Sequence, residues 1–119
     1  MTVQECYTLL QGDYEDVLAR MRSDRLVQKF LLKFPDDPSY GALCAAMEAH
    51  DREEAFRAAH TIKGVCQNLS FTRLYGSAAA LCDALRTQWS DNAEALARDV
   101  ARDYQAAVNA IQQFREDQA

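Results

Sequence analysis

The sequence is poor both in residues that interrupt helices and in residues that favour strands. Only 2 prolines and 4 glycines occur among its 119 residues. Valine and isoleucine together supply 8 residues, whereas alanine alone supplies 20. Because alanine is the strongest helix former and β-branched side chains are enriched in strands, this balance favours helix. No segment alternates between apolar and polar residues, so we expect no sheet.

Three further features are absent, and each excludes a class of protein. No apolar run approaches the roughly 18 residues that a membrane-spanning helix needs. Neither a basic nor an apolar stretch follows Met1, so we expect no signal peptide and a cytoplasmic protein. Lysine and arginine never form a run, and the formal net charge is -5. We therefore expect neither nucleic-acid binding nor a polybasic membrane anchor.

The cysteines show no metal-binding spacing. They are Cys6, Cys44, Cys66 and Cys82, and no two of them form a Cys-x-x-Cys pair. Each has apolar or alanine neighbours at helical spacing, so we interpret each as a reduced thiol that packs in the core. The sequence therefore predicts neither a disulfide nor a metal site.

Apolar residues recur at helical spacing along the chain, and capping residues and helix breakers divide it into segments. One apolar stripe consists of Leu26, Val27, Phe30, Leu31 and Phe34. The expected helices span about 3–10, 13–21, 23–34, 39–49, 53–69 and 72–88, with a last helix capped by Ser90 or Asp91. Long amphipathic helices with short turns predict an all-α antiparallel bundle, and residues 1–119 have the size of one domain.

The helix starts carry local signals of their own. Asp13, Ser23 or Asp24, and Asp51 have the position and chemistry of N-caps. Glu54 follows Asp51 by three residues, which is the spacing of a capping box.

The segment 53–69 has two distinct faces when its residues are placed about 100° apart. One face is apolar and is expected to join the core: Ala55, Ala58, Ala59, Ile62, Val65, Cys66 and Leu69. His60 points away from that face. Its neighbours on the outer face are Glu53, Phe56, Arg57, Lys63, Gly64 and Gln67.

Two residues of this outer face are hard to explain by stability. Gly64 lies inside the helix, where glycine costs about 1 kcal/mol relative to alanine. Phe56 lies one turn before His60 and adds an aromatic ring to the same side. Flanked by Glu53 and Arg57, the ring, the imidazole and the bare backbone predict a docking patch for a partner.

His60, Lys63 and Gln67 form a group with a common chemistry. An exposed imidazole is a good nucleophile at neutral pH. Lys63 follows one turn later and Gln67 two turns later, so an ammonium and an amide reach the same space. A phosphoryl group on the imidazole would be stabilised and oriented by these two donors.

The motif around His60 resembles that of a known family. Ala59-His60-Thr61-Ile62-Lys63-Gly64, continuing through Asn68-Leu69, is similar to the signature of histidine-containing phosphotransfer (HPt) domains. The run Gly12-Asp13-Tyr14, the apolar stripe near Phe30, and Leu81-Cys82 with Leu85 are similar in kind to those domains.

The resemblance implies a four-helix bundle with short extra N-terminal helices. It implies that His60 accepts the phosphoryl group through Nε2, that Lys63 assists it, and that the face around Gly64 and Gln67 receives the partner. The implied partner is a receiver domain, of a sensor hybrid kinase or a response regulator, with a phosphorylatable aspartate and its own Mg²⁺. No segment resembles an ATP-binding domain, so we expect a monomeric phosphoryl carrier that needs no cofactor and is not a kinase.

Two positions depart from the family pattern. Ser70 stands at the helix end, where the family often has glycine, which leaves the turn geometry open. Arg86 stands where an acidic residue often follows the Leu-Cys-x-x-Leu pattern, and either Asp83 or Gln88 is an alternative contact to the site.

Two other functions remain open from the residues alone. The bundle could be an interaction module that binds a receiver or a helix without accepting phosphate. A metal or haem bundle would need several inward ligands, often Glu-x-x-His pairs, and Arg57 stands where such a glutamate would precede His60. The only other histidine, His50, falls in an expected turn, where we interpret it as a solvated loop residue.

Overall fold

The computed structural model describes residues 1–118, and this part of the chain is helical with no strand. The helices are α1 (Val3–Leu10), α2 (Tyr14–Met21), α3 (Asp24–Lys33), the short 3₁₀ helix η1 (Phe34–Asp36), α4 (Ser39–Glu48), α5 (Arg52–Leu69), α6 (Thr72–Leu85) and α7 (Ala93–Gln118). The all-α prediction is confirmed. None of these helices is both long and apolar enough to cross a bilayer.

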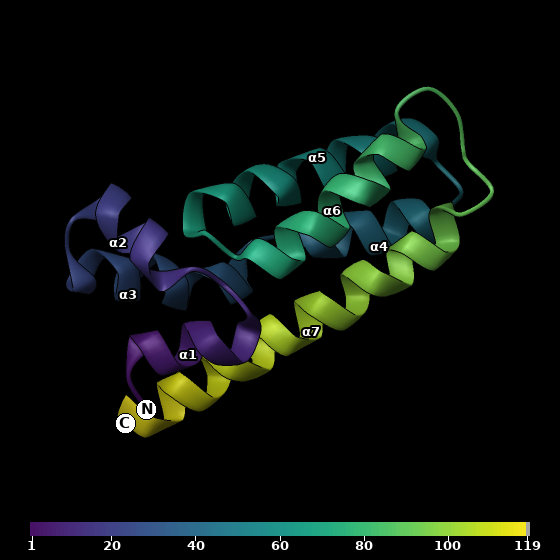
Figure 1. Cartoon of the computed structure of the whole chain (residues 1–119). Coiled ribbons are helices and arrows are strands. Elements are labelled where there is room, and N and C mark those ends of the chain that lie inside the picture. Colours follow the sequence, from purple (N-terminus) through teal and green to yellow (C-terminus); the bar gives the residue numbers. More distant parts are fainter. Residues whose placement is uncertain (119) are drawn as a thin grey trace.

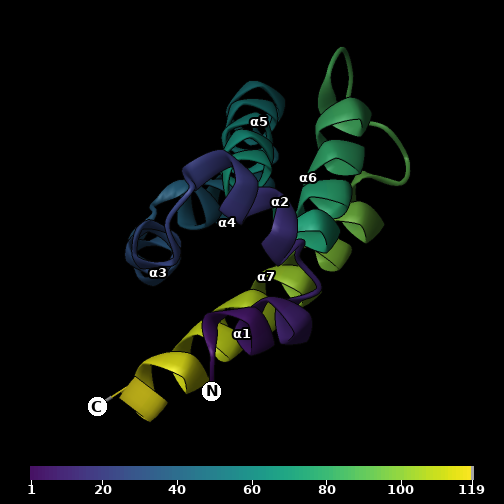
Figure 2. The ribbon, with the colours of Figure 1, turned by 60° about the vertical axis from the view of Figure 1, so that its left-hand side comes forward.

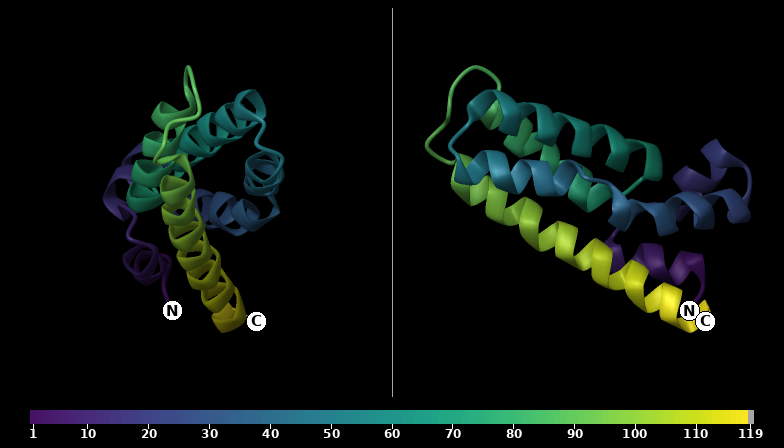
Figure 3. Two further views of the ribbon diagram at one scale, coloured as in Figure 1. Left: turned by 90° about the vertical axis from the view of Figure 1, so that its right-hand side faces the viewer. Right: turned by 180° about the vertical axis from the view of Figure 1, so that it is seen from behind.

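The four helices α4 to α7 form the antiparallel bundle, with successive helices side by side (Figure 1). The most extensive contacts join α5 to α6, α4 to α5, and α6 to α7. The short helices α2 and α3 lie at the end of the bundle where α5 finishes (Figure 2). α1 packs along the C-terminal half of α7, and the view from behind shows both chain ends together (Figure 3).

Local capping chemistry explains several helix starts. The side chains of Asp13, Ser23 and Asp51 each accept a hydrogen bond from the backbone N–H three residues later. These three N-caps are confirmed. The second half of the expected capping box is replaced, because the Glu54 carboxylate pairs with the Arg57 guanidinium at 2.6 Å.

Two helix ends differ from the prediction. α6 ends at Leu85 rather than near residue 88. At this end Arg52 donates hydrogen bonds to the carbonyls of Leu85 and Arg86 at 2.9 and 3.0 Å. These bonds satisfy carbonyls that a helix end leaves unpaired. α7 begins at Ala93, so Ser90 and Asp91 lie in the connecting segment before it.

The core contains most of the side chains that the spacing assigned to it. Cys6, Cys66 and Cys82 are fully buried, as expected. Cys44 is exposed, which corrects its interpretation as a core residue. Its neighbour Leu43 takes the buried position on α4, and a helix turns by about 100° per residue.

The apolar stripe of α3 is only partly buried. Val27, Leu31 and Phe34 join the core, whereas Leu26 and Phe30 remain 41% and 42% exposed. α3 lies at the end of the bundle and has few contacts with its neighbours, so Leu26 and Phe30 are only partly covered.

Candidate functional site

The helix α5 holds His60 at mid-length on a solvent-facing surface. Ala55, Ala58, Ala59, Ile62, Cys66 and Leu69 are buried on the opposite face. His60 is exposed, as its position on the helical wheel predicts. Val65 departs from the predicted core face, since it is only half-buried at the edge of that face.

His60 lies in a shallow depression of about 460 Å³ at the N-terminal half of α5. The residues that line it are Arg52, Glu53, Phe56, Arg57, His60, Thr61 and Arg86. The predicted docking residues Glu53, Phe56 and Arg57 therefore share one surface with the imidazole. Arg52, Thr61 and Arg86 were not predicted as members of this site.

Phe56 is the floor of this depression rather than a freely exposed ring. Its centroid lies 6.0 Å from that of the His60 ring, and the ring itself is half-buried against the core. The Arg86 guanidinium carbon lies 5.4 Å from the Phe56 centroid, within the range of a cation–π contact. The cation that caps the end of α6 thus lines the same depression as the imidazole of α5.

Arg86 is fixed by a second contact on its own helix end. Its guanidinium pairs with the Asp83 carboxylate at 3.0 Å. This hydrogen bond raises the pKa of Arg86 above its ordinary value, so the side chain stays cationic. Asp83 therefore reaches the site through Arg86, and the arginine itself occupies the position for which the sequence suggested Asp83 or Gln88.

The predicted residues Lys63, Gly64 and Gln67 do not line the depression around His60. Lys63 is half-buried. Burial raises the pKa of the Cys82 thiol on α6, and the Lys63 ammonium opposes that shift. Gln67 is exposed two turns beyond His60 and belongs to a separate depression near Asp16 and Ser70.

Apart from its chain neighbours and the local backbone of α5, a Cβ atom placed on Gly64 would meet no atom within 4 Å. Internal packing therefore gives no reason for glycine at this position. The same openness is found at Gly41 and Gly76, so it does not single out Gly64 by itself.

The C-terminal end of α5 is held by side chains from the N-terminal helices. Arg20 of α2 donates hydrogen bonds to the carbonyls of Gln67 and Asn68 at 3.0 and 2.9 Å. Tyr7 of α1 donates from its hydroxyl to the carbonyl of Leu69 at 2.8 Å. Three consecutive carbonyls that a helix end leaves unpaired are satisfied in this way.

Ser70 follows α5 in the left-handed conformation with φ 57°. The turn therefore has the left-handed geometry that favours glycine, although serine stands there. Its buried hydroxyl donates to the Asp16 carboxylate and accepts from Arg20, both at 2.6 Å. The hydrogen bonds from Ser70 and Arg20 lower the pKa of Asp16. A serine is suited to this turn because α2 offers its hydroxyl two charged partners.

His50 has a positive φ of 55° in the α4–α5 turn and is exposed, as expected of a loop residue. Its ring also stacks on Trp89, with centroids 3.7 Å apart. No group of three or more histidine, cysteine or acidic side chains gathers in a metal-binding arrangement among residues 1–118.

Comparison with protein-family models gives one match. The model of the Hpt domain matches residues 15–116, which include α2 to α7 almost completely. No curated protein and no solved structure matches the chain significantly.

Proposed function

The chain belongs to the Hpt domain family, whose members carry phosphoryl groups on histidine in phosphorelays and have no kinase activity of their own. On this premise we propose that His60 is the phospho-acceptor. It takes the phosphoryl group from an aspartate of one receiver domain and passes it to the aspartate of another.

The observation that carries this proposal is the setting of His60. The imidazole is exposed in a depression lined by Arg52, Arg57 and Arg86, whose guanidinium groups also pair with the carboxylates of Glu53, Glu54 and Asp83. Cationic groups beside a nucleophile stabilise the charge of an approaching phosphoryl group and of the phosphohistidine that forms. The only other histidine, His50, is covered on one face by Trp89.

The transfer step needs only one nucleophile from this chain. The Nε2 lone pair of His60 attacks phosphorus, the bond from phosphorus to the aspartyl oxygen breaks, and its electron pair remains on the carboxylate. Nδ1 keeps its proton throughout. The partner's Mg²⁺ supplies most of the charge stabilisation, and this chain contributes position and cationic groups.

In this proposal Lys63 and Gln67 contact the phosphoryl group bound on His60. Neither lines the depression, so each reaches the phosphoryl group by turning its side chain along α5 once that group is bound. Gly64 leaves the backbone open where the partner approaches, and Glu53, Phe56 and Arg57 contact its surface. The carrier itself binds no metal, acts as a monomer and works in the cytoplasm.

The test is a transfer assay with receiver domains phosphorylated in the presence of Mg²⁺. We expect acid-labile, alkali-stable phosphate on the wild type and none on His60→Gln. The matched control is His50→Gln, which removes the only other imidazole and should be labelled like the wild type. Circular dichroism confirms that all three proteins are folded.

The outcomes separate the possible functions. Label on both the wild type and His60→Gln would place the acceptor elsewhere, and loss of label in His50→Gln would identify it. A folded wild type that binds receivers but accepts no phosphate would favour an interaction module.

A further inference from the structure

One side chain at the start of α5 is bonded to the backbone at the end of α6. Arg52, the first residue of α5, donates from Nη1 to the carbonyl oxygens of Leu85 and Arg86, at 2.9 and 3.0 Å. Leu85 is the last residue of α6, and Arg86 is its C-cap. The two helices are therefore joined at this end of the bundle by hydrogen bonds to the main chain (Figure 1).

Arg52 is the most sheltered of the three arginines that line the depression around His60. Its side chain is 31% exposed, compared with 53% for Arg86 and 70% for Arg57. Its ion pair with the adjacent Glu53 is long, at 3.8 Å, so its two bonds to carbonyls are closer contacts. Hydrogen bonds from a charged donor are stronger than those between neutral groups.

These bonds act where α6 no longer fixes the backbone. The chain is not helical between Leu85 and Ala93. The Arg86 N–H lies 3.4 Å from the Asp83 carbonyl oxygen, which is long for a hydrogen bond. The bond from Arg52 to the Arg86 carbonyl is shorter, so Arg52 has a large part in placing this residue.

The side chain that Arg52 places in this way lies next to the imidazole. The Arg86 guanidinium carbon lies 5.4 Å from the Phe56 centroid, and that centroid lies 6.0 Å from the His60 ring. One aromatic ring therefore contacts both groups. The Asp83 carboxylate accepts from Nη2 of Arg86. A guanidinium has five N–H donors, so donors remain for a phosphoryl group.

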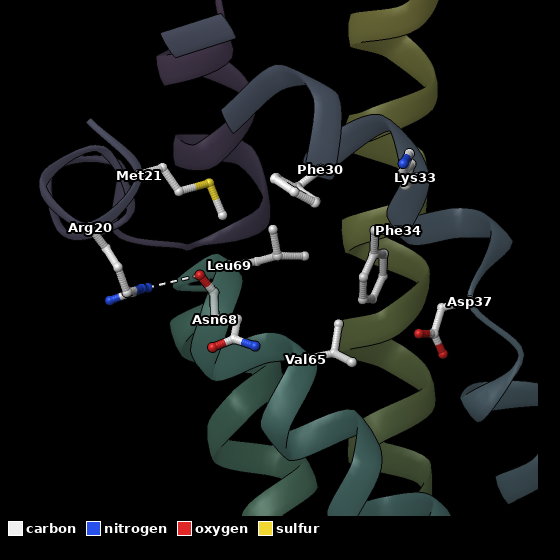
Figure 4. Close-up of a pocket in the computed structure, with 9 residues that line it drawn as sticks. All are labelled: Arg20, Met21, Phe30, Lys33, Phe34, Asp37, Val65, Asn68 and Leu69. Atoms are coloured by element: carbon white, nitrogen blue, oxygen red, sulfur yellow. Dashed lines mark hydrogen bonds between the residues drawn. The ribbon is translucent and has the colours of Figure 1, made fainter. Parts of the chain in front are cut away.

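Arginines bond to helix ends elsewhere in the molecule, but not beside His60. Arg20 donates to the carbonyl oxygen of Asn68 at the other end of α5 (Figure 4). Arg115 of α7 donates to the carbonyl oxygen of Leu32 at 2.7 Å. Neither arginine lines the depression. Arg52 differs from them because one carbonyl that it holds belongs to Arg86, whose side chain lines the depression.

We propose that Arg52 is a positioning residue for phosphate transfer and acts through Arg86. By holding the end of α6, Arg52 sets where the Arg86 guanidinium lies, and this guanidinium pairs with the phosphoryl group once His60 carries it. The inference rests on the proposed function, because it concerns the phosphorylated state of the same histidine. Without Arg52 the segment after α6 shifts, and a cation is withdrawn from the phosphoryl group.

The test follows the phosphoryl group in the isolated protein, without a receiver domain. The probe is phosphoramidate: the imidazole nitrogen attacks phosphorus, the phosphorus–nitrogen bond of the donor breaks, and ammonia leaves. Titration by ³¹P NMR then gives the pKa of the phosphohistidine, and the resonance that His60→Gln removes is the one followed. A nearby guanidinium stabilises the dianion and lowers this pKa.

We expect Arg52→Gln and Arg86→Gln each to raise the pKa of the phosphohistidine by about 0.5 unit. The matched control is Arg115→Gln, which removes the same charge and a hydrogen bond to a helix-end carbonyl, and should leave this pKa unchanged. Thermal melting confirms that each variant is folded at the temperature of the titration.

A double-mutant cycle separates positioning from a direct effect of the Arg52 charge. If Arg52 acts through Arg86, Arg52→Gln should cause no further shift in an Arg86→Gln background. Should Arg52→Gln unfold, Arg52→Lys replaces it. Lysine keeps the charge but lacks the planar guanidinium, so positioning predicts a shift and a direct charge effect predicts none.

Each result either supports the inference or overturns it. Additive shifts in the cycle, no shift in a folded Arg52→Gln, or an equal shift in Arg115→Gln would overturn it. A folded wild type whose His60 takes no phosphate from phosphoramidate would contradict both the inference and the proposed function. Coupled shifts in a protein that accepts phosphate from no receiver would support the inference and contradict only the transfer between receivers.

Discussion

The two halves of α5 present surfaces of opposite kind to solvent. At its N-terminal half, His60 lies in an open depression whose other side chains are mainly charged. At its C-terminal half, the same helix lines an apolar groove whose shape is fixed by hydrogen bonds from Arg20. The first surface is charged and open to solvent, and the second is apolar and fixed in shape.

The contrast shows that one helix presents two kinds of surface along its length. A nucleophile must stay solvated until the partner arrives, and burial among apolar side chains would hinder its access. An anchoring surface needs apolar area that a partner can cover. Placing the two surfaces one and a half turns apart lets each keep its own environment.

The largest expected effect comes from a substitution that removes phosphate acceptance and keeps receiver binding. His60→Gln should abolish phosphate acceptance because it removes the nucleophile. Receiver binding should stay within about twofold of the wild type, because the substitution changes one side chain of a larger surface and, at an exposed position, leaves the fold intact. Calorimetry and the transfer assay on the same protein check both halves of the prediction. Loss of binding together with transfer would show that the imidazole itself contributes to receiver binding.

The next effect comes from disturbing the support of the groove. An alanine Cβ at Gly12 would lie 2.8 Å from both the Ser70 carbonyl oxygen and the Tyr7 ring. We expect Gly12→Ala to lower the free energy of unfolding by about 2 kcal/mol, because the close-packed turn must shift. Chemical denaturation measures the change. Gly41→Ala, where the Cβ meets open space, should stabilise the protein instead.

A smaller effect is expected when the side chain of Lys63, which does not line the groove, is removed. Lys63→Ala should slow transfer at saturating receiver concentration and leave the free energy of unfolding within about 0.5 kcal/mol. Stopped-flow transfer and thermal melting report the two quantities. A rise in the half-saturating concentration alone would assign Lys63 to docking rather than to the phosphoryl group.

The last expected effect is a small gain in stability at Gly64. Gly64→Ala should raise the free energy of unfolding by about 0.5–1 kcal/mol, because alanine favours helix and its Cβ meets open space. Partner binding should nevertheless weaken. Gly76→Ala on α6 makes the matching change and should stabilise the protein without altering binding. Unchanged binding in Gly64→Ala would mean that this glycine does not serve docking.

The parts of the fold that depend on local sequence could be predicted. N-caps at Asp13, Ser23 and Asp51 act within three residues, and the outward direction of His60 follows from helical periodicity alone. The bundle itself follows from amphipathic helices joined by short turns.

The parts that depend on distant packing could not be predicted. Arg86 joins His60 only because α6 ends beside the start of α5, and Arg20 caps α5 from 47 residues earlier in the chain. The exposure of Phe30 follows from the position of α3 at the end of the bundle. A periodic pattern identifies the apolar face of a helix but not how much of it a neighbour covers.

The stack of His50 on Trp89 makes the intrinsic fluorescence of Trp89 sensitive to the structure of one end of the molecule. Trp89 is the single tryptophan of the chain, and it stacks on His50 of the α4–α5 turn. That turn lies at the end of the bundle away from α2 and α3 (Figure 1). Indole emission depends on the groups in contact with the ring, so separating it from the imidazole changes the fluorescence. Fluorescence of the unlabelled protein therefore follows opening of this end, and a partner seated on α3 would leave the signal unperturbed.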